Sequence, residues 1–76
     1  MGEKVDAYVV GRRIGAYLKL TGRKLGWFAE QMGWNNEKAS MITNGKRQIS
    51  LMDFFKVCKV LNVPYEQFIS ENDLIV

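Results

Sequence analysis

Residues 25–45 read Leu-Gly-Trp-Phe-Ala-Glu-Gln-Met-Gly-Trp-Asn-Asn-Glu-Lys-Ala-Ser-Met-Ile-Thr-Asn-Gly, and the two halves of this stretch each have helical spacing. In its first half, four apolar side chains have the i, i+3, i+4, i+7 spacing of one helix face: Leu25, Phe28, Ala29 and Met32. Gly33 comes next, where the chain needs the backbone freedom of glycine to make a tight turn. We therefore predict a short helix that ends before Gly33.

The second half predicts another short helix, which begins near Asn35 and Asn36 and ends at the turn formed by residues 43–45. Successive residues rotate by about 100° around a helix axis, which separates a mainly apolar face from a polar one. We expect Ala39 and Ile42 to point into the core, with Trp34 packing just before the helix. The opposite face is free to meet another molecule and consists of Asn36, Glu37, Ser40, Met41 and Asn44.

Helical periodicity also predicts the remaining elements, and no strand-like alternation is present. Asp6 can cap a first helix that Gly22 ends. Gly11 and Gly15 weaken this helix, so it either depends on tertiary packing or lets another backbone approach closely. Its apolar side is formed by Val10, Ile14, Tyr17 and Leu18.

A fourth helix is predicted after Ser50, which stands three residues before Asp53 as in a capping box. Asn62 ends it, and its apolar stripe is Leu51, Phe54, Phe55, Cys58 and Leu61. Pro64 suits the first turn of a last short helix that carries Tyr65, Phe68 and Ile69. The prediction is an all-α domain of five helices over residues 1–76, with residues 70–76 as a tail.

The composition fits one small folded domain. The chain has 76 residues, of which 47% are hydrophobic and 25% are charged, and a chain this short cannot divide its apolar surface between two cores. The net charge is +3, but residues 9–47 hold eight lysines and arginines against two glutamates. Such a basic region suggests a polyanionic partner such as nucleic acid or a membrane surface, although a solvated surface explains it equally well.

Several functional classes lack their usual residues. The chain has no histidine and a single cysteine, Cys58, which we expect to be a small buried hydrophobe. No metal site, cofactor, small-molecule ligand or catalytic group is predicted, so we do not expect an enzyme. No apolar run is long enough to span a bilayer and no signal peptide is recognisable, so we expect a cytoplasmic protein.

Two short helices joined at Gly33, the second exposing amides and followed by Lys46 and Arg47, suit the reading of a DNA major groove. Asparagine can pair with adenine, and basic loop residues can neutralise phosphates. The sequence resembles the Cro and phage-repressor (XRE-like) helix-turn-helix family, without gaps, over about residues 10–69. The resemblance rests on Phe-Ala-Glu-Gln-Met-Gly at 28–33, Ser-x-Ile-x-Asn-Gly-Lys-Arg at 40–47, Ser-Leu at 50–51 and Val-Cys-Lys-Val-Leu-Asn-Val at 57–63.

The resemblance implies a lambda-repressor-like domain that places the helix at about 35–44 in the major groove. Residues facing the base edges would be Asn36, Glu37, Ser40 and Met41. Residues contacting phosphates would be Lys24, Asn35, Asn44, Lys46, Arg47 and Gln48. Glu37 can accept a hydrogen bond from cytosine but is repelled by phosphates. Met41 either touches a thymine methyl or is a solvent-facing or interface residue.

Some positions depart from the family pattern. The family commonly has a phosphate-binding glutamine where this chain has Leu25, and it often has an Arg–Glu ion pair where this chain has Leu18 and Thr43. Trp27 replaces a residue that is usually polar. It either covers the first helix or forms part of a protein interface, whereas Trp34 is expected in the core.

The expected function is a sequence-specific transcriptional regulator of double-stranded DNA. Short relatives of this size include phage Cro-like repressors, restriction-modification control proteins and antitoxin-type regulators. Binding to a palindromic operator would require a homodimer, with contacts expected from Phe68, Ile69, Leu74, Ile75 and Val76 unless this end is frayed. The alternative is a helix-turn-helix fold used for protein binding, as an antirepressor or a toxin partner.

Overall fold

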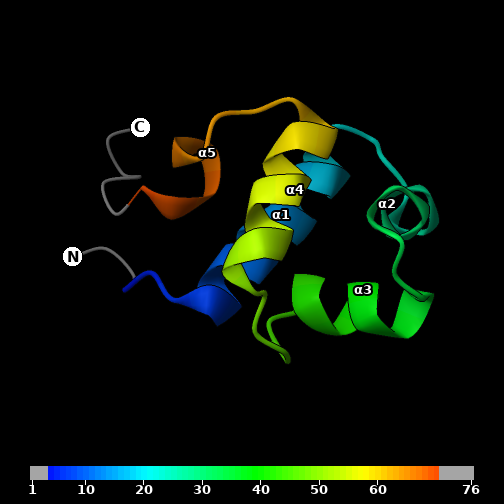
Figure 1. Cartoon of the computed structure of the whole chain (residues 1–76), viewed down its shortest axis with the longest axis horizontal. Coiled ribbons are helices and arrows are strands. Elements are labelled where there is room, and N and C mark those ends of the chain that lie inside the picture. Colours follow the sequence, from blue (N-terminus) through cyan, green and yellow to red (C-terminus); the bar gives the residue numbers. More distant parts are fainter. Residues whose placement is uncertain (1–3, 71–76) are drawn as a thin grey trace.

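The computed structural model describes residues 4–70, in which the chain forms five helices and no strand. They are α1 (Ala7–Leu20), α2 (Leu25–Met32), α3 (Asn36–Thr43), α4 (Leu51–Leu61) and α5 (Glu66–Ile69) (Figure 1). The all-α prediction is therefore confirmed. No helix within residues 4–70 has the length and apolar character that crossing a bilayer requires.

Short polar side chains and left-handed residues set the helix ends, as the sequence predicts. The Asp6 carboxylate accepts hydrogen bonds from the amides of Tyr8 and Val9, at 3.0 and 2.9 Å. The Ser50 hydroxyl accepts from the Asp53 amide at 3.1 Å. Asn62 ends α4 with φ of 57°, which asparagine tolerates better than most residues. These bonds satisfy amides that the first helical turn leaves without partners.

The buried apolar side chains form one cluster to which all five helices contribute. In Figure 1, α4 lies in front of α1 at the centre of the view, with α2 and α3 on one side and α5 on the other. The cluster consists of Val10, Ile14, Leu18, Phe28, Met32, Ile42, Ile49, Phe54, Val57, Cys58, Leu61 and Phe68. Cys58 is thus a buried small hydrophobe, as predicted, and burial raises the pKa of its thiol.

The backbones of α1 and α3 approach each other at two glycines. A Cβ atom on Gly11 would collide with the carbonyl oxygen of Ile42. A Cβ atom on Gly15 would lie 2.7 Å from the carbonyl oxygen of Thr43. Both distances are below van der Waals contact, so only glycine fits at either position. The two glycines in α1 therefore hold α3 at close range, which is one of the two roles the sequence left open.

The buried face of α4 consists of different residues from the predicted apolar stripe. Leu51 and Phe55 are 65% and 38% exposed, whereas Val57, which the predicted stripe omits, is completely buried. The buried face is Phe54, Val57, Cys58 and Leu61, which itself has the i, i+3, i+4, i+7 spacing. Phe55 projects about 100° away from that face and contacts the ring of Tyr65 instead, at 5.1 Å between centroids.

The expected dimer contact at Phe68 is also wrong, because this side chain is only 1% exposed and belongs to the core. It packs edge-on against Tyr17 at 5.6 Å. Arg13 holds the end of α5 in place by donating to the carbonyl oxygens of Phe68 and Ser70, at 3.1 and 2.8 Å. Ile69 is 41% exposed, and residues 74–76 lie outside the described residues.

We expect Gly11→Ala to lower the free energy of unfolding by about 2–3 kcal/mol, because the added methyl group forces α1 and α3 apart. Urea unfolding followed by circular dichroism measures this change. Gly26→Ala is the matched control, since nothing lies within 4 Å of a Cβ atom there. That variant should gain up to about 1 kcal/mol through helix propensity. Equal effects at the two glycines would contradict the close crossing of α1 and α3.

Candidate nucleic-acid interface

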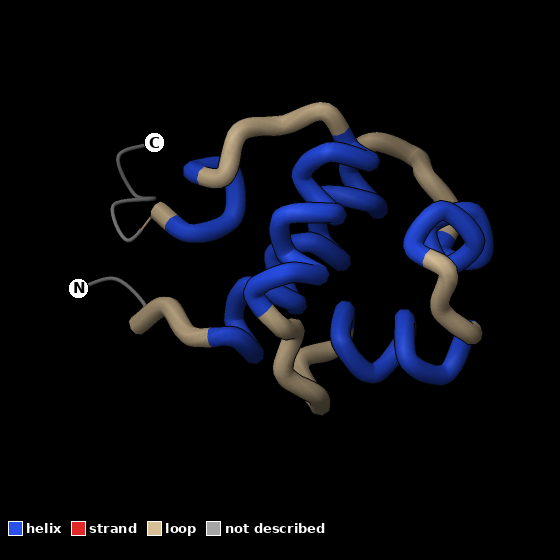
Figure 2. Tube along the Cα trace, viewed as in Figure 1, coloured by secondary structure: helices blue, strands red, loops and turns tan. Residues whose placement is uncertain are grey.

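The two faces of α3 are separated as the sequence predicts. Ala39 and Ile42 are 0% and 1% exposed and face the core. Asn36 and Glu37 are exposed on the opposite side, and Ser40 and Met41 are half-buried. Figure 2 shows α3 along one edge of the molecule. We call the surface formed by Asn36, Glu37, Ser40 and Met41 the outer face of α3.

Asn35 fixes the beginning of α3. Its side-chain oxygen accepts a hydrogen bond from the Lys38 amide at 2.8 Å, which satisfies one of the free amides of the first turn. Only the Nδ2 group of this side chain therefore remains for a contact with a phosphate. The tight turn that precedes the helix depends on Gly33, whose φ is 75°, a backbone conformation that favours glycine.

The far end of α3 turns sharply into a basic loop. Asn44 donates from Nδ2 to the Ser40 hydroxyl at 3.2 Å, so these two predicted site residues bind each other. Gly45 has φ of 74°, and the Lys46 amide closes the turn by donating to the Met41 carbonyl at 2.8 Å. The structure places the next three predicted phosphate contacts at the exposed surface: Lys46, Arg47 and Gln48.

The crossing of α1 and α3 brings two further cations to this end of the helix. The Arg12 side chain lies against Gly45, where an added Cβ atom would be 2.6 Å from its Cγ. Lys19 and Asn44 line a hollow of about 240 Å³ between α1 and the end of α3. Sequence reasoning did not assign either cation. Lys19 follows Gly11 and Gly15 at intervals of four, and this spacing is the signal that places it on the side of α1 that faces α3.

Lys38 and Lys24 occupy different surroundings from these cations. Lys38 lies 4.8 Å from the centre of the Trp34 ring and 3.6 Å from the Asp53 carboxylate, so it is held toward α4 and away from the outer face. Trp34 itself packs edge-on against Phe28 in the core, as expected, with 5.7 Å between ring centroids. Lys24 precedes α2 with an exposed side chain that makes no capping hydrogen bond.

Trp27 is 38% exposed and is covered on one side by arginine. The Arg23 guanidinium lies 5.6 Å from the Trp27 ring and 5.9 Å from the Tyr17 ring. Cation–π contacts of this kind join α2 to α1 across the turn between them. Trp27 therefore packs toward the first helix through Arg23, which favours one of its two predicted roles.

The charges of the site are concentrated at one end. Arg12, Lys19, Lys46 and Arg47 lie around the C-terminal end of α3, whereas Glu37 is the only charged residue on the outer face. The carbonyls at that end of the helix carry partial negative charge, which these cations offset. The arrangement offers hydrogen-bonding groups along a helix and a place for anions at its end.

No protein-family model matches the sequence, and no curated protein matches it significantly.

We expect Asn35→Ala to lower the free energy of unfolding by about 1 kcal/mol, because the amides at the beginning of α3 lose their cap. Asn35→Ser retains an acceptor and should restore most of that loss. Asn36→Ala is the matched control, since Asn36 is exposed and should change stability by less than about 0.5 kcal/mol. Chemical unfolding compares the variants, and equal losses at both asparagines would contradict the capping role.

Proposed function

We propose that the chain is a sequence-specific transcriptional regulator that binds double-stranded DNA through a helix-turn-helix formed by α2 and α3. The observation that carries this proposal is the division of α3 into a buried side and an exposed polar outer face, with cations gathered at one end. A helix presented in this way fits the width of a major groove. The resemblance to Cro and phage repressors supports the same interpretation and adds the lambda-repressor-like arrangement.

The outer face of α3 is proposed to read base edges. Asn36 is exposed at the beginning of the helix, and its amide can pair with adenine through two hydrogen bonds. Glu37 beside it can accept from the amino group of cytosine, and Met41 one turn later can contact a thymine methyl. Ser40 has its hydroxyl fixed by Asn44, so it contributes a hydroxyl of defined position.

The basic end of α3 is proposed to hold the DNA backbone. Lys46, Arg47 and Gln48 follow the turn at the exposed surface, where they would bind phosphates together with Lys24, Asn35 and Asn44. Arg12 and Lys19 add positive charge at the same end. Because the outer face has no cation of its own, these flanking residues supply most of the electrostatic affinity.

One copy reads about half of an operator, so the proposed target is a palindrome bound by two copies. Half-sites about one helical turn apart would place both α3 helices on one face of the duplex. A small switch protein of the Cro-like repressor class, acting in the cytoplasm on phage or prophage DNA, fits this mode of binding.

A second function is favoured by the same outer face, whose only charged residue is Glu37. A neutral or slightly acidic surface repels phosphate and suits a protein partner, as in an antirepressor or an antitoxin-type complex. Salt dependence separates the two functions. Each phosphate contact weakens DNA binding by about 0.9 log unit for each tenfold rise in salt, a rule that a protein partner does not follow.

Selection of binding sites from random duplexes tests the proposal. The wild-type chain should enrich a palindrome. Asn36→Ala should change the preferred bases, because this residue contacts base edges. Arg47→Ala should weaken binding to all sequences alike. It should also reduce the steepness with which the logarithm of the binding constant falls with the logarithm of salt concentration by about 0.9, the contribution of one phosphate contact.

Two outcomes contradict the proposal. Failure of the wild-type chain to enrich any sequence would refute specific DNA binding. Identical changes in sequence preference and salt slope for both variants would refute the assignment of Asn36 to bases and Arg47 to phosphate.

A further inference from the structure

The exposed apolar side chains of the described residues are unevenly distributed. Five of the eight large ones belong to α4 and the segment that ends in α5, whereas Tyr8, Leu20 and Trp27 lie elsewhere. The five are Leu51, Met52, Phe55, Tyr65 and Ile69. A concentration of this kind in a small protein marks a binding surface more often than a plain solvent-facing one.

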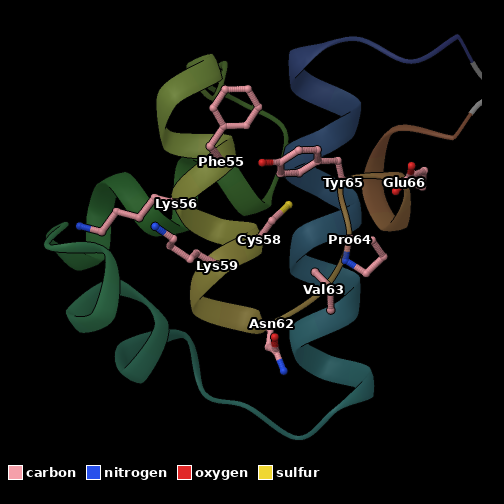
Figure 3. A pocket seen from close by; sticks show the side chains of 9 residues that line it. All are labelled: Phe55, Lys56, Cys58, Lys59, Asn62, Val63, Pro64, Tyr65 and Glu66. Carbon is pink, nitrogen blue, oxygen red and sulfur yellow. The ribbon is translucent and has the colours of Figure 1, made fainter.

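Two of these five residues, Phe55 and Tyr65, line a groove of about 840 Å³ between α4 and the residues that lead into α5. Phe55 and Tyr65 face each other across one end, and Cys58 and Val63 lie along the floor (Figure 3). Figure 3 also shows Lys56 and Lys59 extending from α4 on one side and Glu66 projecting on the other. We call this surface the α4–α5 groove.

The two lysines beside the α4–α5 groove are not equivalent. Lys56 donates to the Met32 carbonyl at 3.2 Å, so it is occupied with the end of α2. Lys59 is exposed and forms no ion pair with any residue in the described range 4–70. The groove therefore presents an apolar floor with one available cation on the α4 side.

We propose that this groove binds residues 71–76 of a second copy of the chain. That segment reads Glu-Asn-Asp-Leu-Ile-Val, with two carboxylates followed by three aliphatic side chains. Its composition matches the α4 side of the groove, because the carboxylates complement Lys59 on the side opposite Glu66, and the aliphatic residues can bury against the apolar floor.

The end of α5 favours a second copy over the same chain as the source of this segment. Arg13 fixes the Phe68 and Ser70 carbonyls, so the point from which residues 71–76 continue is held in place. Figure 3 shows the C-terminal end of α5 leading away from the groove. Reciprocal exchange between two copies fills both grooves, as the two-fold symmetry of a homodimer requires.

This interface replaces the contact expected at Phe68 and does not depend on DNA binding. Self-association of the purified full chain tests it directly, by sedimentation velocity over a range of concentrations in the absence of nucleic acid. The wild-type chain should show a reversible monomer–dimer equilibrium. Lys59→Glu should raise the dimer dissociation constant by about tenfold or more, because like charges then meet in the groove. The double variant Glu71→Lys/Asp73→Lys should do the same.

A mixture of the two variants gives the sharpest result. Each variant repels itself, but the groove of the Lys59→Glu chain fits the lysines of the double variant, and the unaltered groove of the double variant fits the native carboxylates. An equimolar mixture should therefore recover dimers close to the wild-type dissociation constant. Lys19→Glu is the matched control, since it reverses one charge outside the groove and should leave self-association unchanged.

Three results would overturn the proposal. The first is a wild-type chain that stays monomeric up to about 1 mM. The second is Lys59→Glu dimerising as well as the Lys19→Glu control. The third is an equimolar mixture that stays monomeric while both variants retain the circular dichroism of the wild type. Loss of DNA binding alone changes none of these outcomes.

Discussion

The close contact between the backbones of α1 and α3 determines how α3 is held against the domain. Gly11 and Gly15 have no side chains, so the Ile42 and Thr43 carbonyls come within a distance that a methyl group would block. This contact holds α3 with Ala39 and Ile42 inward. The remaining side of the helix therefore faces outward, and its cap and turn are built from Asn35 and Gly45.

The same crossing explains where the positive charge gathers. Arg12 follows Gly11 in α1 and lies against Gly45, while Lys19 lies beside Asn44. Lys38 belongs to α3 itself but is drawn toward Trp34 and Asp53. The proposed DNA contacts thus separate into an outer face without cations, which would supply specificity, and a basic end, which would supply affinity. A dimer through the α4–α5 groove would leave this basic end uncovered.

Local signals predicted most of the fold. The predicted caps at Asp6 and Ser50 act through their own neighbouring amides, so the sequence contains all the partners involved. The exposure of a side chain depends on residues distant in the sequence, because periodicity shows which side of a helix is apolar but not which element covers it. For this reason the predicted burial of Phe55 and the predicted dimer contact of Phe68 were both wrong. Phe68 is buried because α5 packs against Tyr17. The position of Arg12 beside Gly45 likewise depends on how α1 packs against α3. Lys19 is different, because its four-residue spacing from Gly15 places it on the side of α1 that faces α3.

We propose that the outer face of α3 and its basic end form the surface that meets DNA. Amide resonances of the isotope-labelled chain, followed during titration with a mixed-sequence duplex at low salt, test this most directly. We expect the largest shifts at Asn36, Glu37 and residues 44–48, with residues 55–59 of α4 unchanged. Shifts centred on the α4–α5 groove, with α3 unaffected, would contradict it.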